Sequence, residues 1–178
     1  MLLCGTCRKI YRAANLQMLT FIVLRANKGG RVTIDVHGKE NIPEKDGFMF
    51  FPNHQGMYDV LAIVEACSHP FSVVAKKEVE NVQFLKQVFK CMKAYTMDRS
   101  DVRQAMKVIT AVSKEVENGR NYLIFPEGTR SKNGNHVQEF KGGSLKQRQK
   151  QNVRIIPVAL IDSFKPFDTN SIEPVTVQ

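Results

Sequence analysis

The chain has 178 residues, of which 43% are hydrophobic, and its 26 Lys and Arg against 17 Asp and Glu give a formal net charge of +9. This length and composition allow one α/β domain with a hydrophobic core and exclude two large domains. The positive charge indicates an anionic partner such as nucleic acid, a phospholipid surface or a phosphorylated substrate, but nucleic acid is disfavoured because there is no Trp and no RNP-like or zinc-finger pattern.

The first 34 residues carry basic side chains and no acidic one. Their longest nearly apolar run, residues 18–24, is far shorter than the roughly 20 residues of a transmembrane helix. We expect residues 1–30 to form a basic amphipathic helix on an anionic membrane, which predicts a peripheral or monotopic protein at the cytoplasmic face of the cell membrane. The alternative is a terminal helix packed on the domain with its charges in water.

Residues 31–178 are expected to form the α/β domain. Residues 31–36 alternate between apolar and polar side chains, as a half-buried strand does, and turn residues at 41–47 separate them from a second strand. The first half of this domain is expected to have strands at 31–36, 48–51 and 71–75 and helices starting near Met57 and at 82.

A helix starting at Asp101, capped by Ser100, and ending at Gly119 is expected next. Strands are predicted at 122–125 and 153–161, the second at a sheet edge or bulged because it contains Pro157. Residues 171–178 resemble the start of a further strand, which leaves open whether the native chain continues beyond Gln178. The alternation predicts a mainly parallel or mixed sheet flanked by helices.

The segment after strand 48–51 combines a histidine with a carboxylate. His54 and Asp59 are five positions apart, about 140° around a straight helix, so they cannot act from one helix face. We expect a loop through 53–56 and a helix whose first turn contains Asp59, where the helix dipole favours a negative charge. Such a pair is a general base with its orienting group, and because no serine or cysteine nucleophile is indicated, the nucleophile is expected to be a substrate hydroxyl.

A second candidate segment follows strand 122–125. Gly128 allows the backbone close to a ligand, and Arg130 presents a fork suited to two phosphate oxygens. The alternative is a turn in which Glu127 and Arg130 pair with each other. Ligands gather at the carboxyl ends of parallel strands, so we expect one crevice where three strands end, at Phe51, Met97 (just before Arg99) and Phe125.

The remaining histidines and the cysteines indicate no second centre. His37, His69 and His136 lack a partner in sequence and are interpreted as structural. Cys4 and Cys7 form a single Cys-x-x-Cys pair, which is insufficient for zinc. Cys67 and Cys91 lie in apolar helical patterns and are expected in the core of a protein in a reducing compartment. No metal is predicted.

The motifs together resemble those of the glycerolipid acyltransferases, most closely the bacterial 1-acyl-sn-glycerol-3-phosphate acyltransferase type. Residues 53–59 match the family's His-x4-Asp motif, and 125–131 match its second hallmark almost letter for letter. Arg99 stands where the family has an arginine, and 156–158 resemble its proline-containing motif. The likeness covers roughly residues 31–162. One position differs, because Lys93 stands where the family often has glycine.

The resemblance implies acyl transfer from acyl-CoA or acyl carrier protein to the sn-2 hydroxyl of lysophosphatidic acid, giving phosphatidic acid, with no bound cofactor. His54 would act as general base and Asp59 would orient it. The acceptor's phosphate would be held by Arg99, Glu127, Gly128, Thr129 and Arg130, with Asn53, Gly56, Ser131 and Pro157 in support. Alternatives are acylation of glycerol 3-phosphate or another lysophospholipid, and a non-catalytic module that binds anionic lipid.

Overall fold

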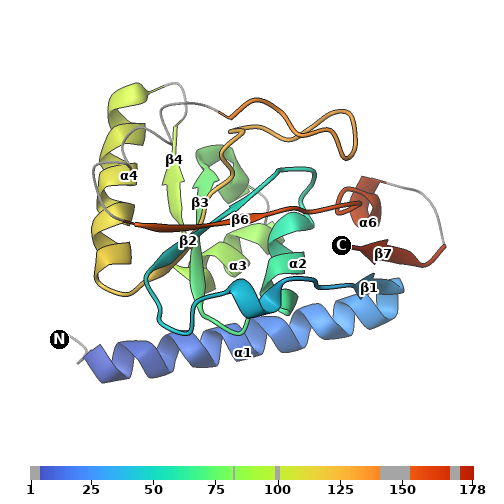
Figure 1. The fold of residues 1–178 in the computed structure, drawn as a ribbon, viewed down its shortest axis with the longest axis horizontal. Coiled ribbons are helices and arrows are strands. Elements are labelled where there is room, and N and C mark those ends of the chain that lie inside the picture. Colours follow the sequence, from blue (N-terminus) through green and yellow to red (C-terminus); the bar gives the residue numbers. More distant parts are fainter. Residues whose placement is uncertain (1–4, 82, 99–100, 141–152, 169–172) are drawn as a thin grey trace.

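The computed structural model describes residues 5–81, 83–98, 101–140, 153–168 and 173–178. A five-stranded sheet in the order β4-β3-β5-β2-β6 forms its centre, and every pairing between these strands is parallel. The strands are β2 (Phe48–Pro52), β3 (Phe71–Lys76), β4 (Tyr95–Met97), β5 (Asn121–Leu123) and β6 (Arg154–Val158). The α/β class and the parallel sheet expected from the sequence are confirmed (Figure 1).

The interior strand β2, between β5 and β6, is buried along its whole length, because helices cover both faces of the sheet. Phe48 and Phe50 belong to a core cluster with α1 and α2, whereas Met49 and Phe51 belong to the cluster with α4. A strand buried on both faces reads as a continuous apolar run rather than an alternating one. The strand expected at 48–51 is confirmed, and its continuous apolar run agrees with burial on both faces.

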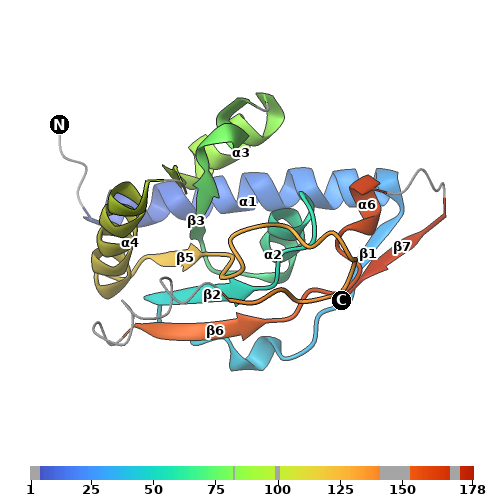
Figure 2. The same cartoon turned by 90° about the horizontal axis from the view of Figure 1, so that it is seen from above.

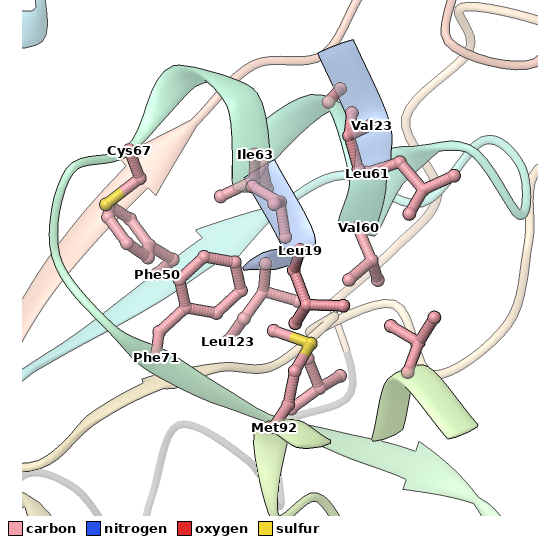
Figure 3. Close-up of a cluster of buried hydrophobic side chains, with 14 of the residues drawn as sticks. Leu19, Val23, Phe50, Val60, Leu61, Ile63, Cys67, Phe71, Met92 and Leu123 are labelled. Carbon is pink, nitrogen blue, oxygen red and sulfur yellow. The ribbon is translucent and has the colours of Figure 1, made fainter. Parts of the chain in front are cut away.

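Five α-helices are described: α1 (Gly5–Gly30), α2 (Asp59–Ala66), α3 (Gln83–Met92), α4 (Val102–Glu117) and the short α6 (Lys165–Asp168). Short 3-10 helices, η1 (Lys39–Asn41) and η2 (Lys77–Asn81), connect some of the other elements. Figure 3 shows the main core, where Leu19 and Val23 of α1 lie beside Val60, Leu61 and Ile63 of α2, with Phe50 and Phe71 of the sheet in the same cluster. This packing fixes α2, the helix that carries Asp59, against the sheet.

Helix α1 runs along the molecule and packs on the domain through one side (Figures 1 and 2). Leu16, Leu19 and Val23 are buried on that side. Further along the same side, Asn27 accepts a 2.6 Å hydrogen bond from the Tyr58 hydroxyl and donates to Glu65. Burial raises the pKa of Tyr58, as does the nearby Glu65 carboxylate, so the hydroxyl keeps its proton for this bond.

The opposite side of α1 is also apolar. Met18, Phe21 and Ile22 are 43–58% exposed, and the Arg25 guanidinium lies 5.0 Å from the centre of the Phe21 ring. The helix therefore combines features of both alternatives considered for it, since one side packs on the core while the other presents apolar and basic groups to the outside. None of the described helices is long and apolar enough to cross a membrane.

A second, two-stranded parallel sheet pairs β1 (Val32–Ile34) with β7 (Val175–Val177). The strand expected at 31–36 is thus shorter, because Val36 lies beyond the pairing and is 41% exposed. The expectation of a further strand within 171–178 is confirmed. β1 directly follows α1 in sequence, and β7 follows the last strand of the main sheet. Their pairing therefore brings together two distant segments of the chain.

Several boundaries differ from the sequence predictions by one or two residues. Asp101 is the N-cap of α4, accepting from the backbone N–H of Gln104 at 3.0 Å, so the helix starts one residue later than expected; the proposed cap Ser100 lies outside the described residues. β5 ends at Leu123, although the N–H of Ile124 still donates to Phe50 at 3.0 Å. Pro157 lies in edge strand β6, where its missing N–H costs no ladder bond to a further strand.

Lys93 follows α3 with a left-handed φ of 50°. The N–H of Ala94 reaches back to the carbonyl of Phe89 at 2.9 Å, which is how a helix closes at a left-handed C′ residue. Glycine is the usual residue there because a Cβ makes the conformation unfavourable. The lysine at the position where the family often has glycine therefore keeps the conformation that glycine would favour.

An ionic cluster ties α4 to the sheet. Glu115 accepts from the Arg120 guanidinium and the Tyr122 hydroxyl, and from the Tyr95 hydroxyl at 3.0 Å. Although burial favours the neutral acid, the hydrogen bond from Tyr122 and the charge of Arg120 lower the pKa of Glu115. The carboxylate is therefore ionised at neutral pH and holds three neighbouring elements together.

Candidate active site

The loop between β2 and α2 brings His54 and Asp59 together. Asp59 lies in the first turn of α2 and is fully buried, and one of its oxygens is 2.7 Å from His54 Nδ1. This is the geometry expected from their spacing. A carboxylate can only accept, so Nδ1 carries the proton and Nε2 remains as the acceptor, which is the tautomer that a general base needs.

Three further donors surround the Asp59 carboxylate. The backbone N–H groups of Gln55 and Gly56 donate to it at 2.8 and 3.0 Å. The hydroxyl of Ser163, from the segment after β6, donates at 2.7 Å. Four donors thus stabilise the negative charge of a carboxylate that has no contact with solvent.

The imidazole of His54 is held by its own backbone and by an aromatic ring. The backbone N–H of His54 donates to the Glu127 carboxylate at 2.9 Å, and the backbone carbonyl of His54 accepts from the N–H of Ser131 at 2.8 Å. The ring stacks on Phe125 with 3.8 Å between centroids and 18° between planes, and the side chain stays 17% exposed. Glu127, Ser131 and Phe125 all belong to the segment after β5, so the two candidate segments form one structure.

Glu127 lies inside this structure. It is 1% exposed, and its second oxygen accepts from the backbone N–H of Gln138 at 3.1 Å. No ion pair joins Glu127 to Arg130 among the residues that the structure describes, so the pairing considered as an alternative for this turn is not seen. Gly128 makes the turn possible with φ 73°, and its N–H donates to Phe125 at 3.2 Å.

Thr129 and Arg130 have a different setting from Glu127. Both are exposed, and both line a cavity of about 360 Å³ together with His54. The deeper walls are apolar and come from α2, β3 and α3, including Val60, Leu61, Val73 and Val88. Lys76, at the end of β3, lines the same cavity and pairs with Glu78 at 2.8 Å. The sequence pattern did not mark Lys76 as a site residue, since the predicted strand 71–75 ends one residue before it.

Asn53 and Gln55 connect the histidine loop to the segment after β6. Asn53 exchanges two hydrogen bonds with the backbone of Leu160, at 2.9 and 2.6 Å. Gln55 donates to Leu160 and Asn135 and accepts from Ser163. Pro157 pairs with Phe51 in the ladder just before these contacts. Asn53 and Pro157 were named from the sequence; Gln55 and Ser163 were not.

Gly56 is required by close packing. A Cβ at this position would lie 3.1 Å from Phe164 Cα and 3.3 Å from the Ser163 carbonyl, which is tighter than ordinary contact. The segment that carries Ser163 therefore approaches the histidine loop only because residue 56 has no side chain. The close approach at Gly56 is made by the protein's own backbone.

Arg99, the other basic residue named for phosphate binding, lies outside the described residues. The strand before it, β4, is at the edge of the sheet, separated from β5 by β3. Two of the three strand ends expected to converge, those of β2 and β5, are direct neighbours. The third strand end, that of β4, is farther away. The sequence alone did not predict this, because the order of strands along the chain does not give their order in the sheet.

The other histidines and the cysteines lie elsewhere. His37 pairs with Asp35, and His69 with Asp46 at 2.8 Å. Cys67 is buried in the core, as expected, and burial raises the pKa of its thiol to about 11, whereas Cys91 is only partly buried against the core. Among the described residues, no group of three or more His, Cys, Asp or Glu side chains is placed to hold a metal ion.

Fold and site define a class of α/β protein in which a histidine, paired with a buried carboxylate, lines a largely apolar cavity together with an exposed arginine. The Acyltransferase family model matches residues 33–161. Because this match covers more than half of the chain, the protein belongs to the Acyltransferase family.

Named relatives lie within this family. The chain is 32% identical over 159 residues to the 1-acyl-sn-glycerol-3-phosphate acyltransferase of Borreliella burgdorferi, covering 86% of this chain and 63% of that one. It is 30% identical to the enzyme of the same name from Helicobacter pylori, covering 68% and 51%. The chain thus spans between half and two thirds of the length of these relatives.

A solved structure supports the fold. The crystal structure of the 1-acyl-sn-glycerophosphate acyltransferase from Thermotoga maritima superimposes with a TM-score of 0.69 at 24% identity. The match covers 91% of this chain and 65% of that one. At this identity the comparison supports the same fold.

Proposed function

We propose that the protein transfers an acyl group from acyl-CoA or acyl carrier protein to the sn-2 hydroxyl of lysophosphatidic acid, making phosphatidic acid. The observation that carries the proposal is that His54, oriented by Asp59, lines the same cavity as Arg130 and a set of apolar side chains. A base, a cation and an apolar space are what a hydroxyl, a phosphate and an acyl chain require. The named relatives support this choice of reaction.

The chemistry needs one proton to move twice. His54 Nε2 takes the proton of the acceptor hydroxyl as its oxygen attacks the thioester carbonyl carbon. The tetrahedral intermediate collapses by breaking the carbon–sulfur bond, and the imidazolium returns the proton to the leaving thiolate. Asp59 stabilises the imidazolium between these two steps, as the carboxylate of a catalytic triad does.

The acceptor's phosphate is assigned to the rim of the cavity. Arg130 can bind two phosphate oxygens with its guanidinium, and Thr129 beside it supplies a hydroxyl. Arg99 remains a proposed second cation. Glu127 and Gly128 serve the phosphate indirectly, since the buried carboxylate and the left-handed glycine fix the turn that presents Arg130.

Helix α1 is proposed to lie on an anionic membrane surface at the cytoplasmic face. Its outer side offers Met18, Phe21 and Ile22 to the acyl boundary and Arg25 to the headgroups. Both substrates of the proposed reaction then meet the enzyme where one of them resides, because lysophosphatidic acid is a membrane lipid.

The decisive experiment is His54→Ala assayed by thiol release from acyl-CoA with lysophosphatidic acid as acceptor. We expect near loss of turnover in a folded protein, and retained turnover would refute the mechanism. His37→Ala is the matched control, because His37 also pairs with an aspartate but is exposed. Products from a panel of lysophospholipids and glycerol 3-phosphate, with both donors and identified by mass, separate the acceptor alternatives; transfer to none of them would indicate a lipid-binding module.

A further inference from the structure

Ser163 lies two residues beyond the part of the chain that matches the Acyltransferase family model. It is fully buried, and its hydroxyl is 2.7 Å from Asp59 Oδ1. The contact joins residues 104 positions apart. Its side chain thus reaches the carboxylate from a segment with no other assigned role in the chemistry.

The hydrogen-bond network determines which way the Ser163 hydroxyl points. Gln55 Nε2 donates to the Leu160 carbonyl and to Asn135, so its Oε1 faces Ser163. This oxygen accepts the Ser163 backbone N–H at 3.0 Å and lies 2.9 Å from the hydroxyl. The single hydroxyl proton goes to Asp59, because that contact is shorter and its acceptor is charged.

The two oxygens of Asp59 divide their donors evenly. Oδ2 accepts from His54 Nδ1 and from the Gln55 N–H, whereas Oδ1 accepts from the Gly56 N–H and the Ser163 hydroxyl. Removing the hydroxyl leaves Oδ1 with one donor. The carboxylate can then rotate or draw more strongly on the imidazole proton, and both effects act on the base.

We propose that Ser163 is a positioning residue of the catalytic base, whose hydroxyl holds the Asp59 carboxylate in the orientation and charge state that keep His54 Nε2 available. The proposal rests on the proposed function, since it assumes that His54 is the base. It assigns the segment after β6 a part in the chemistry as well as in the fold.

Ser163→Ala tests this with little structural change, because the backbone N–H bond to Gln55 does not need the side chain. We expect kcat/KM to fall about tenfold, the effect of losing one hydrogen bond to a charged group. A carboxylate that has lost a donor stabilises the imidazolium more, so the acidic limb of the pH profile of kcat/KM should move to higher pH. Ser163→Thr, which keeps the hydroxyl, should restore part of the activity.

Ser113 provides the matched control. It is a buried serine on α4, and among the described residues its hydroxyl has no hydrogen-bond partner, so Ser113→Ala should change neither kcat/KM nor the pH profile. The proposal is overturned if Ser163→Ala keeps the wild-type kcat/KM and pH profile. It is also overturned if the loss of kcat/KM comes without a shift of the acidic limb, which indicates a packing effect alone. Turnover in His54→Ala would instead refute the proposed function.

Discussion

Replacing Asp59 by asparagine should separate the electrostatic role of this residue from its shape. The carboxylate accepts four hydrogen bonds, and an amide of the same size has one oxygen to accept with. If the amide nitrogen takes the place of Oδ2, it faces two donors, the His54 ring and the Gln55 N–H. If it takes the place of Oδ1, it faces the Gly56 N–H, while Ser163 can turn its proton to Gln55.

Either orientation leaves one buried backbone N–H without an acceptor, which costs about 1–3 kcal/mol. For a chain of this size that is a fall in Tm of roughly 3–9 °C. The effect on turnover should be larger. Loss of the carboxylate lets the imidazole take the tautomer with its proton on Nε2, and the same change in a serine protease triad costs about 10⁴ in kcat. We expect kcat to fall by about 10³ to 10⁴.

The assay is thiol release from acyl-CoA with lysophosphatidic acid, beside thermal unfolding followed by circular dichroism. Asp35→Asn is the control, because Asp35 pairs with His37 at 3.1 Å but both side chains are about half exposed or more. A folded Asp59→Asn protein with more than about a tenth of the wild-type kcat would refute the tautomer argument.

Three further predictions concern other parts of the molecule. Arg130→Ala should raise the KM for lysophosphatidic acid about tenfold or more with a smaller change in kcat. Arg154→Ala, at the other end of the sheet, should leave this KM unchanged. If Arg130→Ala has the wild-type KM, the assignment of the phosphate to Arg130 is wrong. The double variant Phe21→Ser with Ile22→Ser should reduce sedimentation with anionic vesicles. The control pair Val102→Ser with Met106→Ser, also exposed but on α4, should not. If the α1 variant binds vesicles as the wild type does, α1 is a packed helix alone. Glu115→Gln should lower Tm at pH 7, and the Tm difference from the wild type should shrink below about pH 4. The reason is that folding lowers the pKa of Glu115. Such a group stabilises the protein above its unfolded pKa and loses this contribution as the pH falls. A Tm difference that is constant from pH 7 to pH 3 would contradict the ionic role of Glu115.

The sequence predicted the elements whose signals are local. The apolar run 48–51 identified a strand, and the spacing of His54 and Asp59 identified a loop followed by a helix start. These inferences worked because the apolar pattern of a strand and the charge preference of a helix's first turn are both set by residues close together in sequence. The two hallmark motifs were expected at one site for a different reason, because ligands gather at the carboxyl ends of parallel strands.

The rest of the site depends on contacts between distant segments. Ser163 and Gln55 have no local pattern that marks them, and they matter only because β6 pairs beside β2. Likewise, the cavity walls need α3 to pack near α2. Glu127 was expected to touch phosphate, and its burial with hydrogen bonds from the backbones of His54 and Gln138 could not be read from local sequence. One sequence gives the residues of an α/β fold but not the order of its strands.

The segment after β6 also determines when the protein can become competent during its synthesis. Helix α1 and the histidine loop leave the ribosome before Leu160 and Ser163, which follow their partners in the loop by more than 100 positions. Contacts over such separations form slowly, since a long loop must close before they contribute. A nascent chain can therefore present the outer side of α1 to lipid before its histidine is fully supported, so that proposed membrane contact precedes chemistry in the life of each molecule.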